Sequence, residues 1–303
     1  MSNDNSTRLL APSTPLASTQ WLADHLGTDG LVVLDGTVLD VASPAGGRTW
    51  LSGYDQYLVE GHIPGALFAE VLEEFSDPSG RFAFTRPSAE QFSSAVAGLG
   101  IGTDSRVVVY DTSIGQWASR LWWLFRSFGF ENVSVLDGGL TNWRPGERPL
   151  EFGHVAAGSV TPDAAFEATA IPGFWADKAD VEAVIAGERA ATLVCSLPPS
   201  DFAGETGNRS RLGHIPGSVN VPSGRLVQRE DRTLLRGDAL AERLAPATAS
   251  EDPVILYCGA GIAATLGALA LTLEGRTAVA VYDGSLGEWS ADADAPLVTT
   301  AAG

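Results

Sequence analysis

The two halves of this chain repeat the same signals in the same order. Each half carries a β-branched apolar run, a Gly-His-Ile-Pro-Gly pentapeptide, a second apolar run, and an Asp-Gly pair closely followed by tryptophan. Equivalent positions lie roughly 150 residues apart, a common domain size, as three pairs illustrate: His62 and His214, Asp111 and Cys258, Trp143 and Trp289. This regular offset predicts two copies of one domain that differ by short loop changes.

Apolar strands without polar alternation indicate the type of sheet. Runs such as residues 107–110 and 254–257 are continuously apolar, which is typical of parallel strands buried on both faces. Helical stretches are expected over residues 120–128 and 263–273. The fold class is therefore predicted to be α/β, with two domains from an internal duplication, each a mostly parallel sheet flanked by helices.

The domain boundaries follow from a change in composition. Residues 153–172 are aperiodic and hold several Gly, Pro, Ala and Thr residues, which predicts a linker that runs over the surface. We therefore expect an N-terminal domain at 8–152 and a C-terminal domain at 173–303.

Cys258 is the strongest candidate for a reactive residue. It ends the apolar run 254–257 and opens a glycine-spaced loop before a helical stretch. Loop N–H groups and the helix dipole favour a thiolate there, and the thiolate is the nucleophilic form. The predicted active-site loop consists of Gly259, Ala260, Gly261, Ile262, Ala263 and Ala264. An inert buried cysteine is the structural alternative, and phosphatase chemistry is disfavoured because Ala264 stands where a phosphate-binding arginine is needed.

Other conspicuous residues have structural explanations. Cys195 ends a predicted strand and is expected to be structural, with a Cys195–Cys258 pairing unsupported. The pentapeptide histidines occur in both copies, so we expect them to hydrogen-bond the backbone rather than to catalyse. In the first copy Asp111 replaces the loop cysteine. That copy should serve as a scaffold and as one wall of a cleft between the domains.

Composition excludes several classes of function. A net charge of −18 argues against nucleic-acid binding, and no apolar run approaches the ~18 residues of a membrane span. Met1–Thr7 lacks the order of a signal peptide, and two cysteines suit a reducing cytoplasm. The four histidines show no metal-ligand spacing. We expect a cytoplasmic protein that uses no metal or cofactor and acts on small molecules.

These motifs together resemble the tandem-domain rhodaneses, the thiosulfate and 3-mercaptopyruvate sulfurtransferases. The resemblance covers most of the chain and rests on residues 61–65, 213–217, 136–139 with Trp143, 282–284 with Trp289, 122–123, and the loop of Cys258. It implies that Cys258 takes sulfane sulfur as a persulfide and passes it to a thiophilic acceptor such as a thiol or cyanide. Backbone N–H groups of the loop can stabilise that anion without a metal.

The resemblance also implies substrate-binding residues, although this chain departs from the family at several of them. Arg209, or else Arg211, matches an anion-binding arginine, and Trp117 matches an aromatic residue that lines the cleft. Asp201 stands near the position where the family has a second anion-binding arginine, which this chain lacks. Phe84 stands where the 3-mercaptopyruvate enzymes of the family have a histidine. The loop also lacks two hydroxyl residues. The neutral loop favours 3-mercaptopyruvate over thiosulfate. A non-enzymatic rhodanese-like binding or regulatory module is the alternative.

Overall fold

The computed structural model describes residues 15–44, 48–158 and 165–300, and within them two five-stranded parallel sheets. The first has the order β1-β7-β6-β2-β5 and the second β8-β12-β11-β9-β10. Matching strands stand in the same order, which confirms the predicted duplication. The first sheet contains β1 (Leu16–Ala17), β2 (Leu31–Asp35), β5 (Leu67–Phe68), β6 (Arg106–Tyr110) and β7 (Val133–Leu136), and the second β8 (Trp175–Ala176), β9 (Thr192–Cys195), β10 (Val219–Asn220), β11 (Val254–Tyr257) and β12 (Val279–Tyr282).

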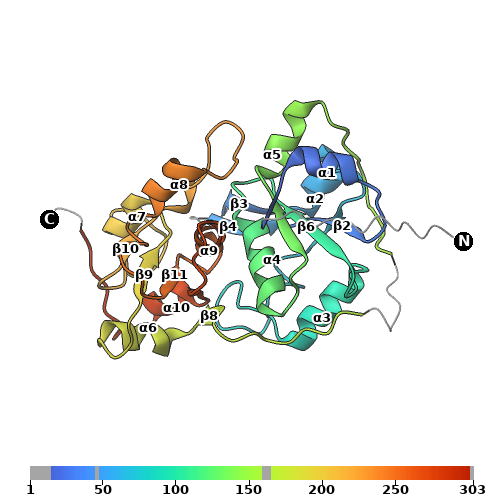
Figure 1. The fold of residues 1–303 in the computed structure, drawn as a ribbon. Coiled ribbons are helices and arrows are strands. Elements are labelled where there is room, and N and C mark those ends of the chain that lie inside the picture. Colours follow the sequence, from blue (N-terminus) through green and yellow to red (C-terminus); the bar gives the residue numbers. More distant parts are fainter. Residues whose placement is uncertain (1–14, 45–47, 159–164, 301–303) are drawn as a thin grey trace, which may run out of the picture.

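Helices flank both sheets, as the sequence predicted (Figure 1). The helix expected over 263–273 has those bounds, whereas the one expected over 120–128 starts earlier, because Gly115 adopts a left-handed conformation that lets the helix begin at Gln116. The α-helices of the first domain are α1 (Thr19–His25), α2 (Tyr54–Glu60), α3 (Ala89–Gly98), α4 (Gln116–Ser127) and α5 (Gly139–Trp143), and those of the second are α6 (Lys178–Ile185), α7 (Pro199–Ala203), α8 (Gly237–Leu244), α9 (Ala263–Leu273) and α10 (Ser285–Ala291).

The two domains meet along α4 and α9, which pack against each other (Figure 1). Most residues of both helices are buried. An interior helix needs an apolar surface all round, and α9 meets this with Ala, Leu and Gly. Helix α4 meets it with aromatic residues, but it also buries Arg120, whose exposure is 0%. A fully buried arginine is rare unless it is paired.

An antiparallel hairpin that the sequence did not predict projects from the first domain. It consists of β3 (Val38–Ala42) and β4 (Arg48–Ser52), with Arg48 Nε 2.7 Å from Asp40 Oδ1 across the pair. Two short strands with mixed polarity carry a weak periodic signal. Trp50 lies on β4 of this hairpin and is 39% exposed, which becomes relevant at the site.

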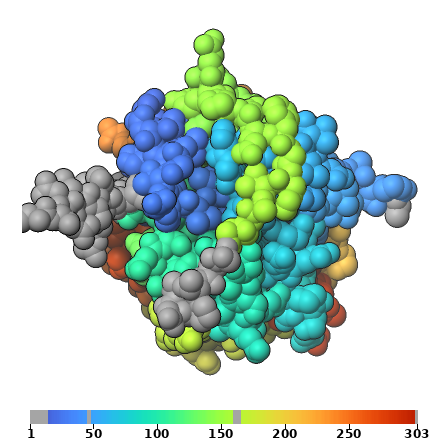
Figure 2. All heavy atoms as spheres, turned by 90° about the vertical axis from the view of Figure 1, so that its right-hand side faces the viewer, coloured from blue at the N-terminus to red at the C-terminus, as the bar shows by residue number. Residues whose placement is uncertain are grey.

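The linker follows the surface of the first domain over its described residues. The N–H groups of Thr169 and Ile171 donate to the carbonyls of Phe128 and Ser127. In Figure 2 the yellow-green segment that ends at residue 158 lies over blue and cyan elements of the first domain. The proposed limits, 153 and 172, stay a prediction. No helix of the described residues is long and apolar enough to cross a membrane.

Candidate active site

Cys258 lies at the carboxyl end of β11, the central strand of the second sheet. Ligand sites in open α/β sheets form at this edge. The loop that follows turns at Gly261, whose φ of +72° is left-handed. A Cβ atom on Gly261 would come 2.8 Å from the Asp283 carbonyl oxygen, so only glycine fits. Helix α9 begins two residues later at Ala263. The predicted strand, loop and helix around Cys258 are thus confirmed.

The start of α10 fixes the first residues of this loop. The N–H groups of Leu286 and Gly287 donate to the carbonyls of Cys258 and Gly259 at 3.0 and 2.8 Å. Ser285 Oγ accepts from the Cys258 N–H at 3.2 Å and donates to the Tyr282 carbonyl at 2.7 Å. In a trans peptide the N–H points opposite to the preceding C=O. Tying these carbonyls to α10 therefore directs the next loop N–H groups away from it.

The equivalent loop of the first domain shows what such N–H groups do. Four of them converge on the buried carboxylate of Asp111, those of Ser113, Gly115, Trp117 and Ala118, at 2.8 to 3.0 Å. Burial raises the pKa of Asp111, and these four hydrogen bonds oppose the rise. The loop is therefore an anion-binding nest. In the second domain, within the described residues, no hydrogen bond reaches the sulfur of Cys258.

A cavity of about 590 Å³ opens beside the loop and is lined by both domains, as the sequence predicted. Gly259 and Ala260 form part of its wall, and Cys258 just before them is 2% exposed. The remaining lining residues of the second domain are Leu197, Asp201, Gly207, Asn208, Arg209, Gly284 and Gly287, and those of the first domain are Asp40, Arg48, Trp50, Phe82 and Ala83.

Arg209 reaches this cavity with an incompletely paired guanidinium. Its side chain is 11% exposed, and its Nε and Nη2 atoms are buried without hydrogen-bond partners. The nearest carboxylate oxygen, on Asp201, is 3.9 Å from Nη2, too far for a hydrogen bond. A buried charge with unused donors is costly unless an anion completes it. Arg209 is thus suited to bind a carboxylate or sulfonate group of a ligand.

The other two predicted substrate-binding residues lie elsewhere. Arg211 donates to the carbonyls of Asp292 and Ala295 and anchors the segment after α10. Trp117 is 2% exposed, packs edge-on against Phe84, and is not among the residues lining this cavity. Trp50, on the unpredicted hairpin, takes this place with 39% exposure. The sequence carries no signal for this role, because the exposure of an aromatic residue depends on the fold.

The remaining special residues match their structural interpretations. Cys195 is fully buried, and burial raises its pKa to about 12, so its thiol stays protonated. It packs in a hydrophobic cluster separate from that of Cys258, and both thiols are free. His62 contacts the carbonyls of Ile63 and Gly153, and His214 that of Phe202. The histidines therefore bond the backbone, as predicted. The described residues contain no metal-ligating cluster.

Known proteins share this duplicated fold. A family model described as the rhodanese-like domain matches residues 18–145 and 197–292. The 3-mercaptopyruvate sulfurtransferase of Escherichia coli is 33% identical over 94% of this chain and 98% of its own length, and the thiosulfate sulfurtransferase of Gallus gallus is 36% identical over 77% and 80%. The crystal structure of an Escherichia coli 3-mercaptopyruvate sulfotransferase superimposes with a TM-score of 0.76 at 32% identity, covering 90% of this chain and 99% of that one.

The fold and the cysteine loop define a tandem α/β protein with a single sulfur nucleophile candidate. The chain belongs to the rhodanese-like family.

Proposed function

We propose that this protein is a sulfurtransferase that moves sulfane sulfur from 3-mercaptopyruvate or thiosulfate to a thiophilic acceptor through a persulfide on Cys258. The observation that carries the proposal is the anion nest of the first domain. Its loop gathers four N–H groups at the position that Cys258 occupies in the second. A loop of this type stabilises a thiolate or persulfide without a metal.

The sulfur passes in two steps. The Cys258 thiolate attacks the donor sulfur and forms an S–S bond. With 3-mercaptopyruvate the C–S bond breaks, and the carbon takes up the thiol proton to give pyruvate. With thiosulfate the S–S bond breaks and sulfite leaves. The acceptor then attacks the outer sulfur of the persulfide, and Cys258 departs again as a thiolate, ready for another cycle.

The charges of the cavity favour 3-mercaptopyruvate as the donor. Arg48 and Arg209 are balanced by Asp40 and Asp201 among the lining residues. The loop itself adds no lysine or arginine. A dianion such as thiosulfate finds little compensation here, whereas one guanidinium suffices for a monocarboxylate. The similar proteins include one named for 3-mercaptopyruvate and one named for thiosulfate, so their names are compatible with either donor.

We place this chemistry in the cytoplasm, with a small-molecule donor and a thiol or cyanide-like acceptor and without nucleic-acid or membrane partners. Support comes from a chain with only two cysteines, both of them free, which suits a reducing compartment. The net charge of −18 also disfavours contact with phosphate backbones.

The test is persulfide formation followed by intact-mass measurement. After incubation with 3-mercaptopyruvate the mass should rise by one sulfur, and cyanide should remove it as thiocyanate. Cys258→Ser should abolish the gain, while Cys195→Ser, the matched control, should keep it. No mass gain with either donor would reject the proposal, and a gain mapping to Cys195 would reject the assignment of the nucleophile.

A further inference from the structure

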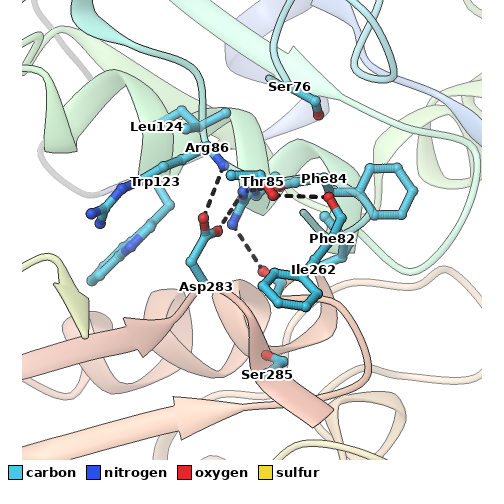
Figure 3. Close-up of polar contacts among 12 residues, drawn as sticks. Ser76, Phe82, Phe84, Thr85, Arg86, Trp123, Leu124, Ile262, Asp283 and Ser285 are labelled. Atoms are coloured by element: carbon cyan, nitrogen blue, oxygen red, sulfur yellow. Dashed lines mark hydrogen bonds and ion pairs between the residues drawn. The ribbon is translucent and has the colours of Figure 1, made fainter. Parts of the chain in front are cut away.

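The aspartates of the two Asp-Gly motifs each cross to the other domain. Asp283 accepts from the Arg86 N–H at 2.9 Å (Figure 3). It also accepts from Arg120 Nη2 at 2.8 Å. In the first domain Asp137 accepts from the Leu234 N–H at 2.8 Å and from Arg236 Nη2 at 2.8 Å. Each aspartate thus binds one backbone N–H and one guanidinium across the interface. The duplication has produced two interdomain links of the same design.

The two links differ in what else the arginine touches. Arg236 has a 52% exposed side chain, and its further acceptors are the neighbouring Leu234 and Leu235 carbonyls. The side chain of Arg120 is 1% exposed and donates to the carbonyl of Gly261, at 3.3 Å from Nη1. Only the Arg120 link, therefore, reaches the loop of Cys258.

The contact with Gly261 completes the anchoring of that loop. Helix α10 already binds the carbonyls of Cys258 and Gly259, and Arg120 binds the third. The N–H of Ile262 points opposite to the Gly261 carbonyl, as any trans peptide requires. Gly261 also leaves the room that the guanidinium needs, because a Cβ atom there would lie 3.3 Å from Arg120 Nη1.

The same guanidinium holds the facing wall of the cavity. Arg120 Nη2 donates to the Phe84 carbonyl at 2.5 Å, and the φ of Phe84 is +61°, a conformation that needs such support. Phe82 and Ala83, directly before it, line the cavity. The ring of Trp175 lies 4.6 Å from the guanidinium carbon and covers it. One buried side chain thereby connects the loop and the opposite wall.

We propose that Arg120, from the domain without a nucleophile, is a positioning residue for the Cys258 loop: it orients the Gly261–Ile262 peptide so that the loop N–H groups face the reacting sulfur. This inference rests on the proposed sulfurtransferase function. It gives the first domain a specific task in the reaction, since the second domain lacks an arginine at this place in its own sequence: the equivalent of Arg120 in α9 is Gly267.

The experiment compares Arg120→Met with Arg236→Met, the matched variant at the other link. The readouts are the melting temperature, the pH–rate profile for alkylation of Cys258 by iodoacetamide, and kcat and KM for 3-mercaptopyruvate. Removing one hydrogen bond to a charged group should slow alkylation at neutral pH and lower kcat about tenfold. The alkylation profile should shift to higher pH. Arg236→Met should lower the melting temperature only.

Two further variants keep the test decisive if Arg120→Met fails to fold. Arg120→Lys retains the charge with fewer donors, and Asp283→Asn weakens the grip on the guanidinium. Both should shift the alkylation profile in the same direction. A melting-temperature loss with an unchanged profile and kcat in all Arg120 and Asp283 variants would overturn the proposal. Alkylation needs no sulfur donor, so it tests the positioning role of Arg120 independently of sulfur transfer. A wild-type protein that forms no persulfide would reject the proposed function but not this role.

Discussion

At the scale of single residues, the first domain carries buried carboxyl groups where the second carries its two cysteines. Asp111 matches Cys258, and Asp35, at the end of β2, matches Cys195 at the end of β9. Burial raises the pKa of Asp35 to about 6, although hydrogen bonds from Thr37 act against the rise. The first domain thus lacks a nucleophile and also holds acidic groups at a cost to stability.

Asp35→Asn should reveal that cost as a pH-dependent stability difference. The folded-state pKa of about 6 lies above the ordinary aspartate pKa of 3.8, so the folded protein binds the extra proton between these pH values, and the wild type loses stability as the pH rises through them. The free energy of unfolding of the variant, relative to that of the wild type, should therefore be about 2 kcal/mol higher at pH 7 than at pH 4.5. Urea unfolding at both pH values measures this, and a pH-independent difference would show that burial of the charged carboxylate is not the cause.

Arg209→Ala should weaken donor binding, whereas Arg211→Ala should not. The sequence left these two arginines as alternatives, because their spacing alone does not tell which guanidinium faces the cleft. The structure places only Arg209 in the cavity wall. Loss of one charge-assisted contact predicts a KM for 3-mercaptopyruvate raised roughly ten- to a hundredfold. Arg211→Ala should instead lower the melting temperature, since it frees the carbonyls of Asp292 and Ala295. An equal KM effect from both would refute the assignment.

At the scale of elements, the sequence predicted what depends on strong local patterns. Helix α9 and strand β11 have continuous apolar runs with glycine boundaries, and both lie where expected. The β3–β4 hairpin was missed because its two short strands of mixed polarity give a weak periodic signal. Trp117 was assigned to the cleft because the family resemblance matches it to an aromatic residue that lines the cleft. Trp117 lies outside the helix expected over 120–128, whereas the structure places it on α4, where its side chain is buried.

Trp50→Ala and Trp117→Ala should therefore separate binding from stability. Trp50 is 39% exposed and lines the cavity, where its ring lies 5.0 Å from that of Phe84. Its loss should raise the KM for the donor several-fold and should cost less stability than the loss of Trp117, because more of the Trp50 side chain is exposed. Trp117→Ala should cost about 3–5 kcal/mol of unfolding free energy, as is usual for a buried tryptophan. Steady-state kinetics together with urea unfolding of both variants test this, and the opposite pattern would rule it out.

At the scale of the whole molecule, the duplication explains more than the sheet order. The Asp-Gly motifs recur in the sequence, and their aspartates, Asp137 and Asp283, both form interdomain links. The motifs were visible in the sequence, yet their partners were not, because a carboxylate that bonds across a domain interface has no local pattern. Arg120 could not be found in this way either, since its acceptors lie 36, 141 and 163 positions away along the chain.

The overall charge of the molecule should oppose the approach of any anionic donor. The lining arginines and aspartates of the cavity cancel, so the net charge of −18 dominates at a distance. Salt screens such repulsion beyond a Debye length, about 10 Å at 0.1 M. The kcat/KM for 3-mercaptopyruvate should therefore rise several-fold between roughly 10 and 200 mM salt. Alkylation of Cys258 supplies the control, because iodoacetate should accelerate with salt while neutral iodoacetamide should not. If the rate with 3-mercaptopyruvate or iodoacetate falls as salt is added, local attraction by Arg209 outweighs the acidic surface.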